Sequence, residues 1–109
     1  MPHADIKYSA DLSFDAKAAL QRIEAIINDL DPSAGACKGR AYAAEIFHHT
    51  HILVEVSLLP KPHRDHAFMQ SLSQALEADS KSQLTQACKF SLALNFSGEN
   101  YVTNEFKPD

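Results

Sequence analysis

The sequence has few cysteines and no excess of basic residues. Its two cysteines, Cys37 and Cys88, are too few for a disulfide framework or for a zinc site built from paired CxxC motifs. We therefore expect both to be reduced thiols. Lysine and arginine number 10 against 14 aspartates and glutamates, which leaves a net charge of -4 and no general surface for nucleic acid. The composition predicts no nucleic-acid partner.

Membrane and export signals are also missing from the sequence. It contains no apolar run of about 18 residues, and its first residues, MPHADIKYS, lack the basic-then-apolar order of a signal peptide. We expect a cytoplasmic protein with no membrane partner. Its 109 residues are 45% hydrophobic and 22% charged, which is typical of a soluble globular protein and predicts one domain over residues 1–109.

The first third of the chain shows two periodic patterns. Residues 3–8 alternate, with Ala4, Ile6 and Tyr8 on one side, which predicts a half-buried strand. Ser13 is placed to cap a helix, because apolar residues recur after it at steps of three and four. The apolar positions of this helix are Ala16, Ala19, Leu20, Ile23, Ile26, Ile27 and Leu30.

The rest of the chain contains further strand and helix signals after a connection over residues 31–39. Asp65 is placed to cap a second helix, because Pro60 and Pro62 exclude a helix before it. The predicted elements are strands over residues 40–47 and 51–59 joined by a tight turn at HHT, a helix over residues 66–87, a strand over residues 88–96 and a short edge strand over residues 101–106.

The main elements therefore follow the order β-α-β and again β-α-β. Each half should be right-handed, which places both helices on one face of a four-stranded sheet. The predicted class is α+β. The pattern by itself leaves open whether the sheet is ferredoxin-like or another split βαβ arrangement.

Pro2 allows two interpretations. Proline has no amide hydrogen for a sheet ladder, so Pro2 can simply be the residue that begins a strand. If Met1 is removed, Pro2 instead becomes the amino-terminal residue and carries a secondary amine, a base that no ordinary side chain provides. Such a base works best when its pKa lies near the working pH, and burial beside cations lowers the pKa of an amine. The second interpretation makes Pro2 a candidate for proton transfer.

Four segments together resemble one known family. They are PHADIKYS, GRAYAAEIF with Lys38 two residues before its Arg40, HILVEVSLLPKPHRD and FSLALNFSGENY. Their order and spacing are similar, over nearly the whole chain, to those of the 5-carboxymethyl-2-hydroxymuconate isomerase family of the tautomerase superfamily. The most specific part is the Pro-His pair followed by a strand that ends in Tyr-Ser.

This resemblance implies a β-α-β-β-α-β tautomerase-like fold, a homotrimer and no cofactor. It also implies an isomerase of aromatic catabolism that uses Pro2 as acid and base and binds a small-molecule carboxylate substrate. By position, Arg64 matches a substrate-binding arginine, and Arg40 matches the second arginine of a pair. The first of that pair is Lys38 here, which holds a carboxylate as a point charge instead of a bidentate fork.

Simpler interpretations of the polar residues stay open. Arg64 can be a solvated loop charge, and Lys38 with Arg40 can be a pair that protects a sheet edge from unwanted pairing. His49 and His51 have no carboxylate or cysteine at ligand spacing, so we expect a polar turn and no metal site.

The sequence thus predicts a cofactor-independent tautomerase that moves a proton in an enol or unsaturated dicarboxylic acid. The predicted site consists of Pro2 as the catalytic residue and of Lys38, Arg40 and Arg64 as substrate-binding residues. The alternative is a non-catalytic, trimeric ligand-binding protein of the same fold, which applies if Met1 is retained, because an acylated proline nitrogen is no base. A third interpretation is a ferredoxin-like binding module with no family link.

Overall fold

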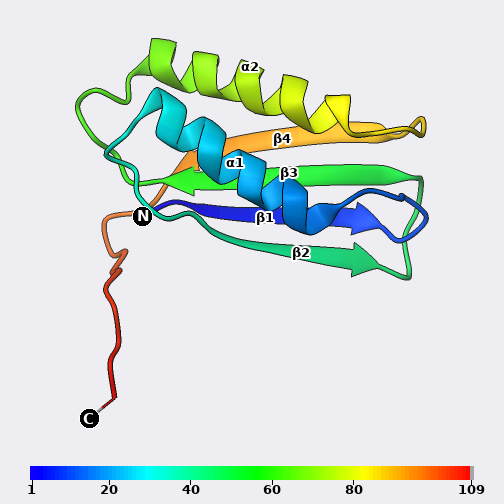
Figure 1. Cartoon of the computed structure of the whole chain (residues 1–109), viewed down its shortest axis with the longest axis horizontal. Helices are drawn as coiled ribbons and strands as arrows, with labels where there is room; N and C mark the ends of the chain where they lie inside the picture. Colours follow the sequence, from blue (N-terminus) through cyan, green and yellow to red (C-terminus); the bar gives the residue numbers. More distant parts are fainter. Residues whose placement is uncertain (109) are drawn as a thin grey trace.

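The computed structural model describes residues 1–108, which contain six regular elements (Figure 1). In chain order they are β1 (His3–Ser9), α1 (Ala16–Leu30), β2 (Lys38–Ala44), β3 (His51–Leu58), α2 (His66–Ser82) and β4 (Lys89–Phe96). This is the predicted β-α-β-β-α-β order, so the predicted fold class is confirmed. Neither helix of the described residues has the length and apolar character needed to cross a membrane.

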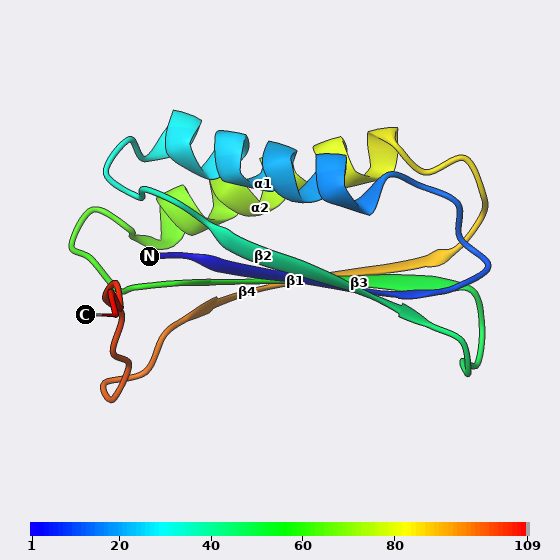
Figure 2. The same ribbon diagram turned by 60° about the horizontal axis from the view of Figure 1, so that its bottom comes forward.

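The four strands form one sheet in the order β2-β1-β3-β4. β1 is parallel to β2, and β3 is parallel to β4, while β1 and β3 are antiparallel neighbours at the centre. Both helices cover the same face of the sheet, and the other face is left open, as Figure 2 shows. Each half is therefore a βαβ unit, and the two halves meet along β1 and β3.

The alternation of the two central strands builds the core between sheet and helices. Along β3 every second side chain is buried, and Ala4 and Ile6 of β1 are also buried, whereas Asp5 and Glu55 lie on the open face. Each large apolar side chain buried in this layer contributes about 1.5–3 kcal/mol to folding. The central buried residues are Ile6, Ile23, Ile27, Val54, Val56, Leu58, Leu72 and Leu76.

The two helices begin at aspartate caps. α2 follows Asp65, whose carboxylate accepts a backbone N–H of the first turn at 2.9 Å, as predicted. α1 follows Asp15, whose Oδ1 accepts the N–H of Ala18 at 3.0 Å, so the prediction that Ser13 caps this helix is wrong. The backbone N–H of Ser13 instead donates to Gln86 Oε1 at 2.8 Å, a contact between two loops that are far apart in the sequence.

Two predicted boundaries are also corrected. β2 covers Lys38–Ala44 and not residues 40–47, because its ladder with β1 already begins at the pair of His3 and Lys38. α2 ends at Ser82 and not at residue 87. At this end the side-chain amide of Gln83 donates to the carbonyl of Asp79 at 3.2 Å, and this contact replaces part of the helix ladder.

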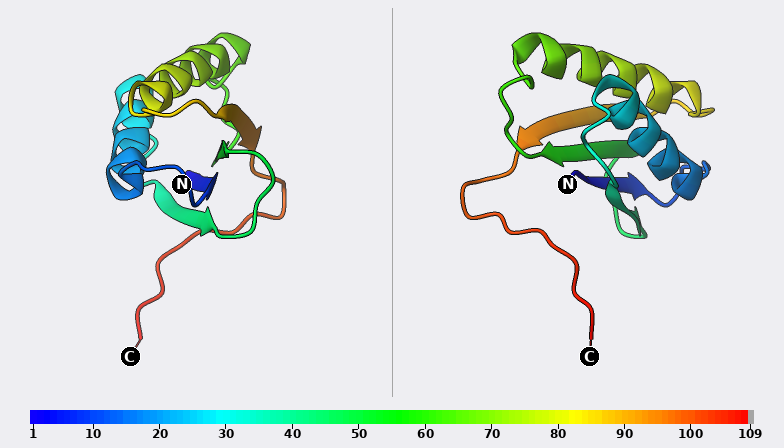
Figure 3. Two further views of the ribbon diagram at one scale, coloured as in Figure 1. Left: turned by 90° about the vertical axis from the view of Figure 1, so that its right-hand side faces the viewer. Right: turned by 60° about the vertical axis from the view of Figure 1, so that its left-hand side comes forward.

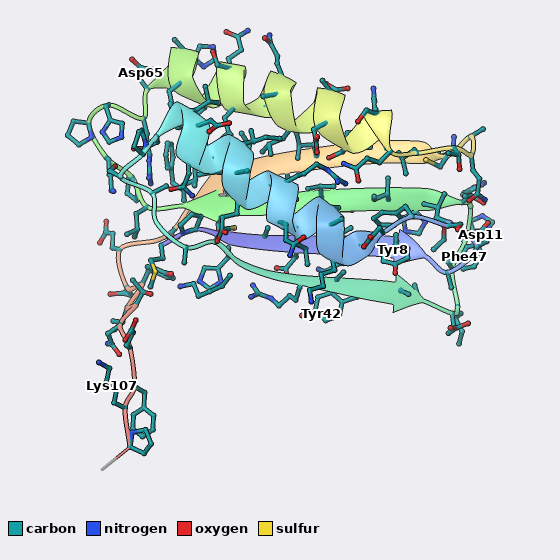
Figure 4. The ribbon with its side chains drawn as sticks, viewed as in Figure 1. Tyr8, Asp11, Tyr42, Phe47, Asp65 and Lys107 are labelled. Carbon is teal, nitrogen blue, oxygen red and sulfur yellow. The ribbon has the colours of Figure 1, made fainter. Side chains whose placement is uncertain are left out.

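Residues 97–108 leave β4 and extend away from the sheet, and we call them the C-terminal arm (Figure 3). The predicted edge strand over residues 101–106 is wrong, since these residues contain no strand. Val102 and Phe106 are 80% and 86% exposed, so they contact no neighbouring strand. Figure 4 shows Lys107 near the far end of this arm. The hydrogen bonds between this arm and the strands come from residues 97–103, which we call the root of the arm.

Candidate active site

Several segments meet at the edge of the sheet where β1 begins, which we call the amino-terminal edge. His3 pairs with Lys38 at the start of β2 and with Ser57 near the end of β3. The loop from β3 to α2 and the root of the C-terminal arm leave the sheet at the same edge (Figures 1 and 3). The topology therefore brings together parts of the chain that are distant in sequence.

Pro2 lies at this edge, directly before β1, and less than 2% of its surface is exposed. Its carbonyl oxygen accepts the backbone N–H of Lys38 at 3.0 Å, which extends the pairing of β1 and β2 by one bond. Because Pro2 precedes β1, its missing amide hydrogen leaves no gap in the sheet. The ring nitrogen is bonded to the carbonyl carbon of Met1 in this chain, and it becomes an amine when Met1 is removed.

The surroundings of the amino terminus disfavour positive charge. The pKa of the Met1 ammonium is lowered, first by burial and then by the charges of Lys38, Lys61 and Arg64. Each of these effects penalises the protonated form of an amine. Pro2 is more deeply buried than Met1, so we expect the amine of a processed Pro2 to experience the same effects.

Lys38 lies between Pro2 and the C-terminal arm. Its Nζ donates to the hydroxyl of Thr103 at 3.1 Å and to the hydroxyl of Tyr101 at 3.4 Å. Within residues 1–108, neither Lys38 nor Lys61 makes an ion pair with a carboxylate. These two lysines therefore bring uncompensated positive charge to the amino-terminal edge.

Arg40 lies on the open face of the sheet and contacts two side chains of β1. Its Nε lies 2.6 Å from Asp5 Oδ1, and its Nη2 lies 3.3 Å from Asp5 Oδ2. The same Nη2 lies 3.3 Å from His3 Nδ1. The contact with Asp5 follows from the parallel register, in which Asp5 and Arg40 are partners. Arg40 is thus connected to the amino-terminal edge through His3.

Arg64 lies in the loop before α2, and its side chain is only 2% exposed. Its Nε and Nη2 contact Asp31 Oδ2 at 2.9 and 2.7 Å, and its Nη1 donates to the carbonyl of Leu59 at 2.7 Å. All three guanidinium nitrogens are therefore used within the chain. Arg64 acts on the amino terminus through its charge, and its predicted contact with a substrate stays a prediction.

Asp31 is kept ionised by its neighbours. Burial raises the pKa of this carboxyl, but hydrogen bonds from Ser33, His63 and Arg64 outweigh burial and hold the pKa well below its usual range. His63 Nε2 lies 2.9 Å from Asp31 Oδ2, and half of the imidazole is exposed. Asp31 consequently pairs with Arg64, whereas Lys38 and Lys61 have no carboxylate partner within residues 1–108.

Tyr101, at the root of the C-terminal arm, is a site residue that the sequence prediction missed. Its hydroxyl lies 2.9 Å from His3 Nε2 and 3.1 Å from the carbonyl oxygen of Met1. Its ring contacts the His3 ring edge to face, with 5.8 Å between centroids. The signal that could have revealed it is the turn at SGEN, where the N–H of Tyr101 donates to the carbonyl of Gly98. This turn brings the tyrosine back to the sheet.

His3 is held in its neutral form. Its pKa is lowered, first by burial and then by the charges of Lys38 and Arg40, with the amino terminus next and Asp5 opposing them. At neutral pH the imidazole therefore has one N–H donor and one acceptor nitrogen.

Two surface hollows of the single chain lie away from Pro2. One, of about 340 Å³, is on the open face and is lined by Asp5, Lys7, Tyr42 and Ala44; Tyr42 is labelled in Figure 4. The other, of about 220 Å³, lies between α1 and β2 and includes Cys37. Pro2 is covered by its own chain and lines neither hollow.

The cysteine and histidine residues do not assemble into a second chemical centre. Among residues 1–108, no group of three His, Cys, Asp or Glu side chains could hold a metal ion. His49 has a φ of 65° in the turn after β2, and its ring lies 4.1 Å from that of His48. Burial, with Glu24 next, raises the pKa of Cys37 to about 11, so this thiol stays protonated at neutral pH.

No protein-family model and no curated protein matches the sequence, but solved structures match the fold. A 5-carboxymethyl-2-hydroxymuconate isomerase from Deinococcus radiodurans R1 has a TM-score of 0.69 and 17% identity, over 97% of this chain and 90% of its own. A protein described as a W0 fused 4-OT wild type symmetric trimer has a TM-score of 0.67 and 13% identity, over 94% and 93% of the two chains. A macrophage migration inhibitory factor-like protein from Entamoeba histolytica has a TM-score of 0.63 and 13% identity, over 94% and 95%.

The chain has a tautomerase-like fold, shared with these structures. The resemblance that the four sequence segments indicated is therefore confirmed for the architecture. Within this fold, Pro2 and Lys38 lie next to each other. Arg40 contacts His3 at the same edge, and Arg64 lies buried nearby. The tautomerase fold thus places all four predicted site residues at or around the amino-terminal edge.

Proposed function

We propose that this protein is a cofactor-independent tautomerase that moves a proton in an enol or unsaturated dicarboxylic acid, similar to 5-carboxymethyl-2-hydroxymuconate. The observation that supports this most is the burial of Pro2 where Lys38, Lys61 and Arg64 lower the pKa of an amino-terminal amine. The Deinococcus neighbour, which is an isomerase by name, has the same fold.

Pro2 is the acid and base of the proposed reaction once Met1 has been removed. An α-amine has a pKa of about 7.7–8.0 in model peptides, and proline's secondary amine is more basic. Burial and the neighbouring cations lower the pKa of the Met1 amine, and the same effects on a processed Pro2 favour its neutral, proton-accepting form. The nitrogen takes the proton of the enol hydroxyl, whose electron pair forms the carbonyl as the double bond shifts. The ammonium then returns a proton to the distant carbon.

Lys38 is the cation best placed to bind a substrate carboxylate beside Pro2. Its ammonium has three N–H donors, and two of them reach hydroxyl groups of the C-terminal arm, at 3.1 and 3.4 Å, so one is left for a carboxylate. Arg40 and Arg64 are the other two residues of the proposed binding set. Arg40 lies next to His3, and Arg64 is buried and contributes through its charge. Lysine holds a carboxylate without the fixed orientation of an arginine fork, so Lys38 tolerates several substrate geometries.

We also propose that the protein is a homotrimer. One structural neighbour is described as a symmetric trimer. Several large apolar side chains are exposed on the single chain, and contiguous patches of such side chains are typical of surfaces that an assembly buries. In the proposed trimer a neighbouring subunit covers the amino-terminal edge and completes a cavity around Pro2. The most exposed large apolar residues are Ile46, Phe106, Val102, Tyr42, Phe96, Leu30 and Phe47.

A non-catalytic ligand-binding trimer is the second candidate, and it applies if Met1 stays attached to Pro2. An acylated proline nitrogen is an amide and accepts no proton near neutral pH. In a chain that retains Met1, the carbonyl of Met1 also occupies the space beside Lys38 and Tyr101. The state of the amino terminus therefore decides between the two candidates.

The deciding experiment compares processed and Met1-retaining protein. Intact mass spectrometry of the native protein shows which form exists, and light scattering gives the assembly size. Both forms are assayed with phenylenolpyruvate and simple 2-hydroxydienoates, whose tautomerisation is followed by ultraviolet absorbance. We expect a native protein without Met1 that is active and a Met1-retaining form that is inactive. A processed protein that converts no enol acid, or a native protein that keeps Met1, would overturn the proposed activity.

A further inference from the structure

The hydroxyl of Tyr101 lies close to the nitrogen that the proposed reaction uses. It is 3.1 Å from the carbonyl oxygen of Met1. That oxygen belongs to the amide of Pro2 and lies about 2.3 Å from the proline nitrogen, because standard bond lengths fix this distance. The hydroxyl therefore lies within about 5.4 Å of the nitrogen of Pro2, whatever the angle between the two vectors.

Neighbouring donors determine the direction of the Tyr101 hydroxyl proton. Arg40 can only donate, so His3 Nδ1 accepts from Arg40 Nη2 and Nε2 carries the hydrogen of the neutral ring. His3 Nε2 then donates to the Tyr101 oxygen, and Lys38 Nζ donates to the same oxygen. The hydroxyl's own hydrogen is left to point at the carbonyl oxygen of Met1.

Asp5 fixes the beginning of this chain of hydrogen bonds. Its two carboxylate oxygens lie 2.6 and 3.3 Å from the Arg40 guanidinium, which orients Nη2 toward His3. Asp5, Arg40 and His3 lie on neighbouring strands in fixed register, so the chain is held by the sheet. The Tyr101 hydroxyl is consequently a preorganised donor that points at the position of the Met1 carbonyl oxygen.

Removal of Met1 deletes the acceptor at that point and leaves the donors in place. The Met1 carbonyl oxygen stands in for an oxygen that is bound next to the Pro2 nitrogen, such as the enol or carbonyl oxygen of a substrate. A preorganised donor stabilises an oxygen most when negative charge develops on it in the transition state. Lys38 donates to the tyrosine oxygen and strengthens this effect.

We propose that Tyr101 is a catalytic residue whose hydroxyl donates to the reacting oxygen of the substrate, in the position that the Met1 carbonyl takes in the unprocessed chain. This inference rests on the proposed tautomerase function. When Pro2 takes the proton of the enol oxygen, Tyr101 stabilises the enolate by a hydrogen bond and keeps its own proton. The electron pair of the broken O–H bond stays on that oxygen and forms the carbonyl as Pro2 protonates the distant carbon.

The test uses the processed protein with Tyr101→Phe, and Tyr8→Phe is the matched control. Tyr8 lies at the opposite end of β1, as Figure 4 shows, so its hydroxyl is remote from Pro2. We expect kcat on phenylenolpyruvate to fall about 100-fold in Tyr101→Phe, with KM changed less than about threefold. The pH dependence attributable to Pro2 should keep its midpoint, and Tyr8→Phe should retain full kcat. Equal kcat values for an active wild type and for Tyr101→Phe would overturn the inference.

A binding measurement separates this inference from the proposed function. Isothermal titration with 2-oxoglutarate, a dicarboxylate with a carbonyl oxygen, needs no turnover. We expect its Kd to be about tenfold weaker for Tyr101→Phe than for wild type, and unchanged for Tyr8→Phe. An inactive wild type that shows this difference would refute the tautomerase activity and support the Tyr101 contact. Unchanged 2-oxoglutarate binding together with unchanged kcat would refute the contact alone.

Discussion

Replacing Asp31 with asparagine removes the charge that balances Arg64. Asp31 is the C-terminal cap residue of α1, and its side chain is 4% exposed beside the 2% exposed Arg64. Asp31→Asn preserves the size of the side chain but leaves a buried guanidinium without a counter-charge. His63 also loses its carboxylate partner on the same oxygen. The substitution therefore tests whether a buried ion pair holds the loop before α2.

We expect this substitution to lower the free energy of unfolding by a large amount for a domain of this size. Removing one partner of a buried ion pair costs about 3–5 kcal/mol. The asparagine oxygen can still accept one hydrogen bond from Arg64, so we expect a value near the lower end, about 3 kcal/mol. At roughly 4 °C per kcal/mol, Tm falls by roughly 12 °C. This loss is a substantial part of the free energy of unfolding of a typical protein, which is about 5–15 kcal/mol.

The dependence of folding stability on pH is an independent test of the same ion pair. The pKa of Asp31 is lowered in the folded protein relative to its ordinary value, so the unfolded state binds more protons between these two values. The stabilisation is fully present above about pH 4 and is lost as the pH falls toward the folded pKa. We expect wild type to lose stability in this acid window and Asp31→Asn to show a flatter curve there.

Urea denaturation at fixed protein concentration measures both effects, because subunit association makes stability depend on concentration. Glu77→Gln is the control, since Glu77 forms an exposed ion pair with Lys81 on α2, and losing such a pair costs about 0.3–0.5 kcal/mol. If Asp31→Asn cost no more than Glu77→Gln, the reasoning about the buried pair would be refuted.

Three further predictions concern packing, capping and thiol reactivity. Gly39→Ala places a Cβ 2.8 Å from Leu20 Cδ2, so the leucine must shift, and we expect a loss of about 1 kcal/mol in urea denaturation. Asp15→Ala removes the cap of α1 and should cost about 1 kcal/mol by the same measurement, while Ser13→Ala should cost much less. Because burial raises the pKa of Cys37 to about 11, iodoacetamide followed by peptide mass spectrometry should label it far more slowly at pH 7 than an exposed free thiol.

The fold was predictable where local pattern and tertiary packing agree. β3 alternates strictly between buried and half-buried residues, and Ala4 and Ile6 of β1 are buried as the alternation predicts. At the end of β1 the pattern breaks, because Tyr8 is only half-buried and Ser9 is buried instead. The errors lie where a contact between residues distant in sequence determines where an element begins. Ser13 and Asp15 are both good cap residues, and the contact of Ser13 with Gln86, distant in sequence, leaves the cap to Asp15. The start of β2 at Lys38 depends on its pairing with Pro2 and His3, which a pattern within β2 cannot show.

The candidate site was predictable in its residue types more than in its contacts. Charge and position marked Lys38, Arg40 and Arg64, but a sequence does not show which partners a guanidinium has. The buried partner of Arg64 is Asp31 at the end of α1, and the partner of Arg40 is Asp5 on the next strand. Both arginines lie within hydrogen-bonding distance of a carboxylate, and only the fold reveals this.

The topology explains why cations gather at Pro2 at all. A βαβ connection between parallel strands returns the chain to the edge where it began, so the first residue of β2 lies beside the first residue of β1. In this chain that residue is Lys38. β3 runs antiparallel to β1 and ends at the same edge, so the following loop brings Lys61 and Arg64 there by a second route. Arg64 is paired with Asp31, so the positive charge without a carboxylate partner in the described residues comes from two lysines, Lys38 at the start of β2 and Lys61 in the loop after β3.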